Sequence, residues 1–402
     1  MSTDPFSPGR LGPLTLRNRF IKSATYEGMS PGGRPSPALV EFHRRLAQGG
    51  VAMTTVAYAA VHADGRTFED QLCLRPATVP SLSELTEAVH QAGAMASIQL
   101  SHCGFFSKLR RADGSGPRGP SLTFNKYGAA SGLPVARAMS PAQIEAIPVQ
   151  FAEAAALAEA AGFDAVEVHL GHGYLLSQFL SPAMNHRRDT WGGSLQGRLR
   201  LPLAVIAAVR ERVGERLAVT AKLNTADGFS GGLSESEGLE IAAAVDEAGI
   251  DGLITTGGST THNPLFLMRG ARPLRAMVAV ERNPLQRMAL RVLGPAVLRE
   301  YPFEEMFFRD AGRRLLSRVE CPVILLGGVV SLANVHQAMA DGFDFVQLGR
   351  ALVADPDLVE RFGRGDAERT RCTACNQCMA SMDDGGVRCV LDDPGGELHV
   401  RG

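Results

Sequence analysis

The sequence predicts an α/β protein with the fold of a parallel (β/α)8 barrel, the TIM barrel. Eight short apolar runs of β-forming residues recur along the 402 residues, and amphipathic helical stretches lie between them. Strands that each lead into a helix close into such a barrel when eight of them follow one another. A doubly wound sheet is the alternative, but no GxGxxG follows the first strand, which disfavours it.

The predicted elements alternate regularly from residue 19 onward. The strands are expected at 20–24, 51–57, 96–100, 165–169, 217–223, 252–255, 323–326 and 345–348. The amphipathic helices are expected at 37–47, 81–92, 141–161, 234–248, 332–340 and 356–362. A further helix should begin after Ser194, whose hydroxyl suits an N-cap.

Three segments exceed a minimal barrel. The basic, Gly/Pro-rich stretch 102–141 is predicted to be an active-site loop. An insertion of about 257–320, between strands six and seven, should be partly helical and shape the mouth of the substrate site. Residues 366–402 carry four cysteines. We therefore expect a barrel with extended loops over residues 1–365 and a short C-terminal cysteine-bearing extension over 366–402.

The composition points to a globular enzyme. Hydrophobic residues make up 45% and charged residues 21%, and the net charge is −1. No basic stripe suggests nucleic acid, no apolar run is long enough to cross a membrane, and the N-terminus lacks the pattern of a signal peptide. We expect a cytoplasmic enzyme of a small-molecule substrate, with a homo-oligomer left open.

Two histidines and a tyrosine follow the predicted strand 165–169. His169, His172 and Tyr174 lie where a barrel keeps its active site, at the carboxyl end of a strand. The histidines could be metal ligands, could be structural, or could donate hydrogen bonds to a carbonyl oxygen that becomes negative in the transition state. Tyr174, with an ordinary pKa of about 10, stays protonated at neutral pH and could deliver a proton.

Glycine-containing turns follow the last two strands. Gly327 and Gly328 end strand seven, and Gly349 and Arg350 end strand eight. Barrels commonly bind phosphate at this position, because glycines let backbone N–H groups approach the oxygens and arginine adds a fork of donors. The alternative is that these residues only form turns, but their recurrence after successive strands favours a phosphate site.

Two polar residues are expected inside the barrel. Lys222 lies near the end of strand five, where a buried lysine needs an anionic partner. That partner could be a bound cofactor or a carboxylate within the barrel. Gln99 ends strand three and could bond the edge of a heteroaromatic ring.

Several of these motifs together resemble one family. The stretch VEVHLGHGYLLSQFLSPAMNHRRDTWGGSLQGRLR resembles the signature of the old yellow enzyme family of NADH:flavin oxidoreductases and ene-reductases. LGPLTLRNRFIKSA, SIQLSHCG and LLGGV…QLGRALVADPDL match that family in order and place, so the resemblance covers most of the chain.

The resemblance implies a TIM barrel with non-covalent FMN, which NADH or NADPH reduces and which passes hydride to an activated alkene. By position, His169 and His172 would bind the substrate carbonyl and Tyr174 would protonate the α-carbon. The FMN site would comprise Ser23, Ala24, Thr25, Tyr26, Tyr58, Gln99, Lys222, Gly327, Gly328, Gly349 and Arg350. The chain departs from the family pattern at Ala24–Tyr26, where a bulky tyrosine stands beside the flavin, and at Arg198, whose segment lacks an asparagine.

The C-terminal cysteines form a second motif. Cys372, Cys375, Cys378 and Cys389 have C-x2-C-x2-C-x10-C spacing, which can hold a [4Fe–4S] cluster or a zinc ion. The motif is similar to that of the 2,4-dienoyl-CoA reductase branch, with one residue fewer in each of the last two gaps. Free or redox-active thiols are the third interpretation.

Three functions compete on this sequence, besides a metal hydrolase built on the pair of His169 and His172. The first is an FMN-dependent oxidoreductase that transfers hydride from NAD(P)H to an α,β-unsaturated carbonyl compound. The second, from the same superfamily, is an enzyme similar to a 2,4-dienoyl thioester reductase, with an iron–sulfur cluster. The third belongs to another class and is a phosphate-binding barrel lyase, in which Lys222 would form a Schiff base.

Overall fold

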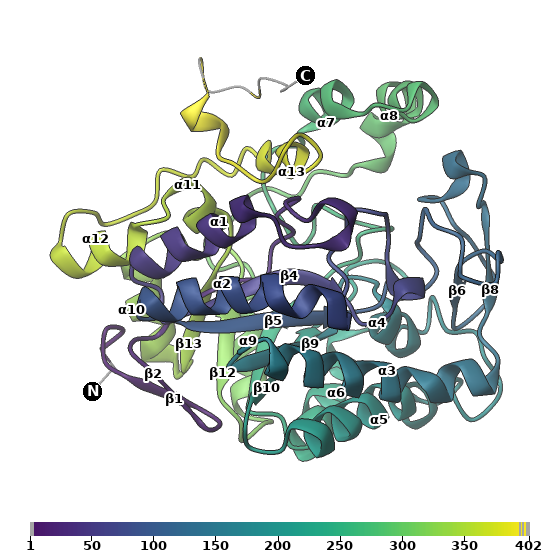
Figure 1. Cartoon of the computed structure of the whole chain (residues 1–402), viewed down its shortest axis with the longest axis horizontal. Coiled ribbons are helices and arrows are strands. Elements are labelled where there is room, and N and C mark those ends of the chain that lie inside the picture. The colour runs from purple at the N-terminus through teal and green to yellow at the C-terminus, as the bar shows by residue number, and fades with distance from the viewer. Residues whose placement is uncertain (1–3, 394, 396–397, 399–402) are drawn as a thin grey trace.

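A closed barrel of eight parallel strands forms the centre of the computed structural model, which describes residues 4–393, 395 and 398 (Figure 1). Around the barrel the strands are β3 (Phe20–Lys22), β4 (Met53–Ala60), β5 (Met95–Ser101), β9 (Ala165–Leu170), β10 (Ala218–Asn224), β11 (Gly252–Thr256), β12 (Val323–Leu326) and β13 (Phe345–Leu348). Each pairs with the next along the chain, and β13 pairs with β3. The predicted (β/α)8 barrel is confirmed, and the doubly wound alternative is wrong.

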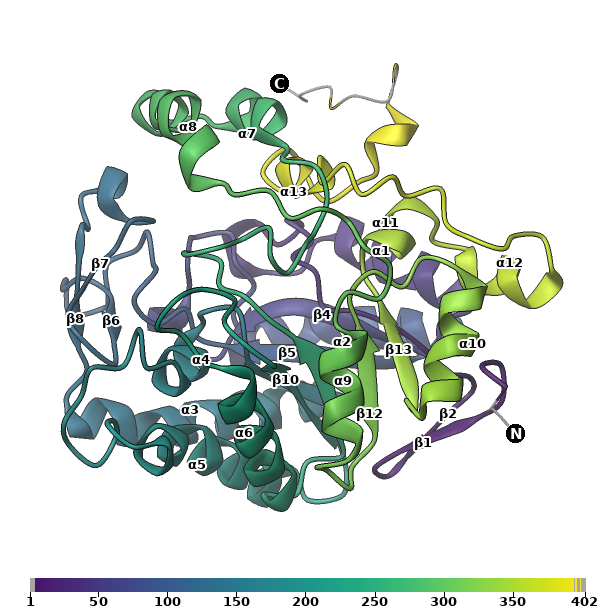
Figure 2. The same cartoon turned by 180° about the vertical axis from the view of Figure 1, so that it is seen from behind.

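Helices surround the barrel in one outer layer (Figure 2). They are α1 (Pro37–Gln48), α2 (Val79–Gln91), α3 (Pro141–Ala160), α5 (Leu195–Val213), α6 (Glu235–Glu247), α9 (Arg309–Leu316), α10 (Leu332–Asp341) and α12 (Leu358–Arg364). Ser194 caps α5 as predicted, because its hydroxyl accepts a hydrogen bond from the Gly197 N–H (3.2 Å). Short helices α4 (Leu175–Leu180) and α11 (Arg350–Ala354) precede the outer helices of two units.

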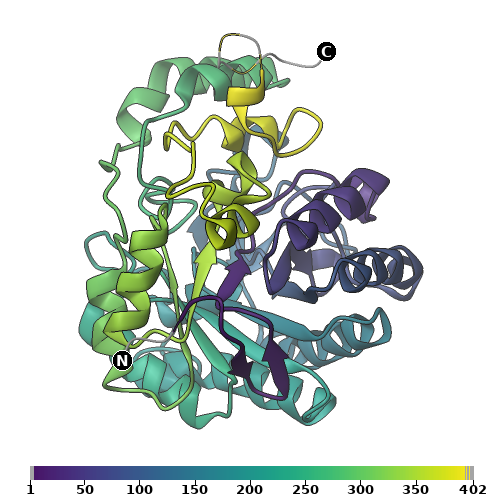
Figure 3. The same ribbon diagram turned by 90° about the vertical axis from the view of Figure 1, so that its left-hand side faces the viewer.

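At the amino ends of the strands, the barrel interior is apolar, and an N-terminal hairpin closes it. This hairpin pairs β1 (Gly9–Leu11) with β2 (Leu14–Leu16), and Leu11 and Leu16 are fully buried. They pack on residues from seven of the strands: Ile21, Met53, Ala165, Ala218, Ile254, Ile324 and Phe345. Figure 3 shows the hairpin on the opposite side of the barrel from the C-terminal tail. The interior is therefore open toward one end only.

Toward the carboxyl ends of the strands, the barrel interior is polar. On β9 the side chains alternate, so that Val166 and Val168 pack outward in the main core while Glu167 belongs to the polar interior. Gln99, Lys222 and Gln347 also lie there, each no more than 2% exposed. Since buried charges are costly unless they are paired, this polar layer is the floor of a site rather than a packing core.

Three further segments rise above this open end. The loop 102–141 forms a small sheet of β6 (Arg118–Gly119), β7 (Thr123–Phe124) and β8 (Val135–Ala138). The insertion contains α7 (Leu274–Val280) and α8 (Pro284–Val297), and the tail contains α13 (Cys378–Ser381). Single-turn 3₁₀ helices lie at Pro31–Gly33, Ala63–Gly65, Pro76–Thr78, Ala129–Ser131 and Val390–Asp392.

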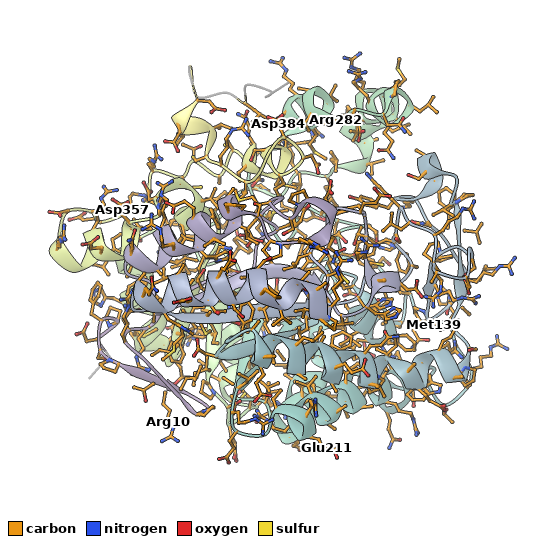
Figure 4. The ribbon with its side chains drawn as sticks, in the orientation of Figure 1. Arg10, Met139, Glu211, Arg282, Asp357 and Asp384 are labelled. Carbon is orange, nitrogen blue, oxygen red and sulfur yellow. The ribbon has the colours of Figure 1, made fainter. Side chains whose placement is uncertain are left out.

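The tail packs against the insertion. Ala380 of α13 is buried against Ala276 and Val280 of α7. Figure 4 labels Asp384 of the tail and Arg282, between α7 and α8, and draws both above the barrel. Among the residues that the structure describes, no helix has the length and apolarity of a bilayer span.

Candidate active site

One pocket at the carboxyl ends of the barrel strands collects every residue predicted for catalysis or for FMN. Its lining includes His169, His172, Tyr174, Ser23, Ala24, Thr25, Tyr26, Tyr58, Gln99, Lys222, Gly327, Gly328, Gly349 and Arg350. Cys372 and Cys378 of the tail also line it. The roles of these residues stay predictions, but the structure brings together side chains from seven barrel strands or the loops that follow them.

The two histidines and the tyrosine form a compact group. The ring centroid of His169 lies 4.9 Å from that of His172 and 4.5 Å from that of Tyr174. Neither ring nitrogen of His169 makes a hydrogen bond of good geometry within the described part of the chain, although the residue is only 3% exposed. A buried imidazole without partners in a pocket is suited to bind a polar ligand atom.

The chain holds His172 in an unusual conformation. Its φ is 61°, which is rare for a residue other than glycine, and its N–H donates to Asn224 Oδ1 (3.0 Å). Asn224 is fixed in turn because its Nδ2 donates to Asp227 Oδ1 (2.9 Å). The ring Nε2 of His172 lies 2.7 Å from Thr256 Oγ1. The sequence did not indicate Thr256, Asn224 and Asp227, since none belongs to a motif that specifies its partner.

Burial sets the protonation states of this group. Burial, and then the charge of His172, lowers the pKa of His169 well below its usual range. Burial and the charge of Lys222 lower the pKa of His172 to about 3. Burial and the neighbouring Tyr58 raise the pKa of Tyr174 well above its usual value. At neutral pH the site therefore offers two neutral imidazoles and a protonated phenol.

These shifts predict a loss of stability in acid. His43, His102, His169 and His172 all have a lowered pKa, chiefly through burial, and for His102 it falls to about 3. Between pH 6.5 and 3, these histidines therefore bind protons in the unfolded chain but stay neutral in the native chain. The contribution to the free energy of unfolding is complete above pH 6.5. It falls with acidification by up to about 1.4 kcal/mol per pH unit for each histidine.

Urea unfolding between pH 8 and pH 5 measures this slope. The variant His102→Asn removes one of the titrating groups and should make the slope shallower. Equal stability at pH 8 and pH 5 would contradict the prediction.

Lys222 has a partner inside the barrel. Its Nζ lies 2.8 Å from Glu167 Oε1 and donates to Ser23 Oγ (3.2 Å). Glu167 also accepts hydrogen bonds from Gln99 Nε2 (2.6 Å) and Gln347 Nε2 (3.1 Å). Of the two alternatives for Lys222, the carboxylate within the barrel is therefore the one observed. An ion-paired lysine is a poor nucleophile, so the lyase hypothesis loses its support.

The glycines and Arg350 lie at one end of the pocket. Gly327 and Gly328 have φ of 109° and 76°, and a side chain at Gly328 would approach Glu304 O to 2.6 Å, so glycine is required there. Within the described chain, all hydrogen bonds of Arg350 use Nη1, to Arg269 O, Met268 O and Asn376 Oδ1. Its Nε and Nη2 remain available to an anion.

The pocket fits a flavin mononucleotide by its unmet polar groups. The Thr25 hydroxyl, the Gln347 Oε1 oxygen and both ring nitrogens of His169 are buried and have no hydrogen-bond partner in the described residues. A heteroaromatic ring system with carbonyl and N–H groups offers partners to such atoms. The phosphate ester would find its donors at the opposite end, near Arg350.

Tyr26 belongs to an aromatic wall of the same pocket. Its ring centroid lies 5.6 Å from that of Tyr58 and 5.2 Å from that of Phe68. Tyr58 in turn stands 5.0 Å from Tyr174. The bulky residue that departs from the family pattern thus packs against neighbouring rings beside the pocket.

The four tail cysteines surround one small cavity, next to the main pocket. Ala374 and Asn376, on either side of Cys375, have φ of 54° and 60°. Within the described part of the chain, no three His, Cys, Asp or Glu side chains lie close enough to share a single metal ion.

The comparisons with known proteins agree with the fold. The sequence profile of the NADH:flavin oxidoreductase / NADH oxidase family matches residues 4–277. The chain is 41% identical over 398 residues to the 4,4'-dithiodibutanoate disulfide reductase of Rhodococcus erythropolis, and the match covers 98% of this chain and 97% of that protein.

Two other similar proteins are longer than this chain. The NADH oxidase of Thermoanaerobacter brockii is 29% identical over 403 residues, which are 98% of this chain but 56% of that protein. A solved structure of 2-naphthoyl-CoA reductase shares the fold with a TM-score of 0.81 at 24% identity, over 98% of this chain and 58% of that one. The chain therefore spans about half the length of these two proteins.

The resemblance to the old yellow enzyme family is thereby confirmed. The family profile matches more than half of the chain, and the chain forms the expected barrel. The chain belongs to the NADH:flavin oxidoreductase / NADH oxidase family and is an NAD(P)H-dependent flavin oxidoreductase.

Proposed function

We propose that this enzyme reduces activated alkenes, in particular α,β-unsaturated carbonyl compounds, at the expense of NAD(P)H. The observation that supports this function is the group of His169, His172 and Tyr174, which presents neutral imidazoles beside a protonated phenol. FMN, when bound, would accept hydride from NAD(P)H and return it to the β-carbon of the alkene.

Each residue of this group has a separate task in the proposal. His169 and His172 bind the carbonyl oxygen, whose negative charge grows as the β-carbon accepts hydride. Asn224 and Thr256 fix His172 for this contact. Tyr174 delivers a proton to the α-carbon, and its raised pKa keeps the proton on the phenol until the carbanion forms.

The remaining residues of the pocket would hold the cofactor. Thr25, Gln99 and Gln347 provide polar atoms along the polar floor of the barrel. Lys222 supplies positive charge there, while Gly328, Gly349 and Arg350 provide the phosphate end.

The visible spectrum of the anaerobic protein tests the proposal. Two flavin bands should bleach on addition of NADH or NADPH, and cyclohexenone should restore them. A reduced enzyme that air reoxidises but cyclohexenone does not would overturn the alkene chemistry.

A second candidate acceptor is an organic disulfide. It is favoured by the 41% identity, over 97% of its length, to the 4,4'-dithiodibutanoate disulfide reductase. Titration of the reduced enzyme with cyclohexenone, 4,4'-dithiodibutanoate and a dienoyl thioester ranks the acceptors by their rates of flavin reoxidation. The thioester tests the alternative of an enzyme similar to a 2,4-dienoyl thioester reductase.

We further propose that Cys372, Cys375, Cys378 and Cys389 bind a [4Fe–4S] cluster rather than zinc. A single zinc ion needs its thiolates within about 2.3 Å of one point, whereas a cluster places them around a larger body. The arrangement of the four thiols around one cavity supports the cluster, as does the similarity of their spacing to the motif of the 2,4-dienoyl-CoA reductase branch. Four irons per chain and a brown absorbance under the flavin bands are expected, whereas one zinc and no iron would overturn this assignment.

A further inference from the structure

We propose that Asn376 is a positioning residue that links the cysteine tail and the insertion to Arg350, and so controls how tightly the phosphate end of FMN is held. The inference depends on the proposed function, because it assumes that Arg350 binds this phosphate. It assigns a task to a residue of the tail that is itself no candidate ligand of a metal or of the flavin.

Asn376 joins three segments of the chain through one side chain. Its Oδ1 accepts a hydrogen bond from Arg350 Nη1 (2.5 Å). Its Nδ2 donates to Met268 O (2.8 Å) and Ala271 O (3.0 Å). Since an amide carries two N–H donors, both are used, and the residue is only 1% exposed. The amide is therefore oriented by the insertion and orients Arg350.

The insertion is itself bound firmly to the tail at this point. Besides its bond to Asn376, Arg350 Nη1 donates a hydrogen bond to Arg269 O of the insertion (2.8 Å). The Ala271 N–H of the insertion donates to Ala374 O of the tail (3.1 Å). A side chain at Gly270 would approach Ala374 O to 2.2 Å, so the two backbones are in close contact. One guanidinium nitrogen is thus fixed from two sides, and the other two remain available to an anion.

The backbone explains why this residue is asparagine. Its φ of 60° is costly for most residues and tolerated by asparagine and glycine. Glycine would accept the backbone but could not reach Arg350. Asparagine meets both requirements.

Riboflavin provides the decisive comparison, because it lacks the phosphate. Apoprotein is titrated with FMN and with riboflavin, and the quenching of flavin fluorescence gives both Kd values. Asn376→Gly keeps the backbone conformation and removes the three hydrogen bonds. It should weaken FMN binding by about tenfold to a hundredfold, the usual effect of losing a hydrogen bond to a charged group, and riboflavin binding by less than about twofold.

Ala374→Gly is the matched control. It changes another left-handed position of the same loop without removing a side-chain hydrogen bond, and both flavins should bind as in the wild type. In the double variant Arg350→Ala/Asn376→Gly, the second exchange should add no further loss to that of Arg350→Ala, because the two residues act as one unit.

The outcomes separate the inference from the proposed function. If Arg350→Ala leaves the preference for FMN over riboflavin unchanged, the proposed phosphate site is wrong and the inference falls with it. If Arg350→Ala abolishes the preference but Asn376→Gly does not change it, only the inference is overturned. Equal losses of both flavins in Asn376→Gly would show a general structural role and also overturn it.

The iron content guards against an indirect effect through the tail. Asn376→Gly should retain the iron of the wild type. Cys375→Ser removes a proposed ligand and keeps Asn376. If it lowers FMN affinity as much as Asn376→Gly, with the same preference between the flavins, the order of the tail rather than the hydrogen bond to Arg350 is responsible.

Discussion

The variant Tyr174→Phe is expected to slow reoxidation of the reduced enzyme by cyclohexenone by about 10²–10⁴-fold, while its reduction by NAD(P)H keeps the wild-type rate. The exchange removes one hydroxyl and leaves the ring, which packs 4.9 Å from Phe106 and 5.0 Å from Tyr58. The site therefore keeps its shape and loses only the proton donor. Rapid-mixing absorbance measurements of the two half-reactions separate these effects.

Tyr127→Phe is the matched control for this prediction. It removes another hydroxyl from the same pocket, where the Tyr127 ring packs 6.1 Å from Phe106, and leaves the Tyr174 hydroxyl in place. Its rate of alkene reduction should stay within a few-fold of the wild type. If both variants lose the same activity, the loss reflects the aromatic group as a whole, and Tyr174 is not the proton donor.

Tyr174→Phe also distinguishes the two candidate acceptors, an activated alkene and an organic disulfide. Reduction of a disulfide needs no proton on carbon, because a thiolate leaves from sulfur. Tyr174→Phe should therefore slow cyclohexenone strongly and 4,4'-dithiodibutanoate only slightly. A large loss with the disulfide would show that Tyr174 serves that reaction as well.

Local patterns in the sequence were sufficient for the barrel and for some members of the pocket, while the resemblance to the old yellow enzyme family supplied the others. The periodicity of apolar residues predicted each strand to within a few residues. Every strand is a short apolar run, which can be recognised from its local sequence. Residues at strand ends then had to meet at one mouth, because all strands are parallel. This is why His169, Lys222 and Arg350 could be placed in one pocket before their contacts were known.

The partners of these residues could not be predicted in the same way. Glu167 shares a strand face with His169, so the alternation of β9 could have indicated it, but nothing local couples it to Lys222 on the next strand. The contact of Asn376 with Arg350 joins a loop of the tail to the first residue of α11, and a loop has no period from which to derive a register. Such partners follow from tertiary packing alone.

The largest expected effect on stability comes from Lys222→Met. Lys222 and Glu167 are each 1% exposed and lie 2.8 Å apart, so the exchange leaves a buried carboxylate without its counter-charge. Gln99 and Gln347 still donate to that carboxylate, but neutral amides do not replace the charge. The free energy of unfolding of the apoprotein should fall by about 3–5 kcal/mol, measured by chemical denaturation.

The double variant Lys222→Met/Glu167→Gln tests the cause of that loss. Without a charge on either side the penalty for an unpaired carboxylate disappears, and most of the lost stability should return.

Lys22→Met is the matched control, since Lys22 is also fully buried and pairs with Glu27 (3.2 Å), outside the pocket. Both single variants should be destabilised, but only Lys222→Met should also lower the reduction potential of the bound flavin, because only Lys222 lines the pocket. If the double variant is less stable than Lys222→Met, the carboxylate is not the source of the penalty, and Lys222 stabilises the barrel by its packing.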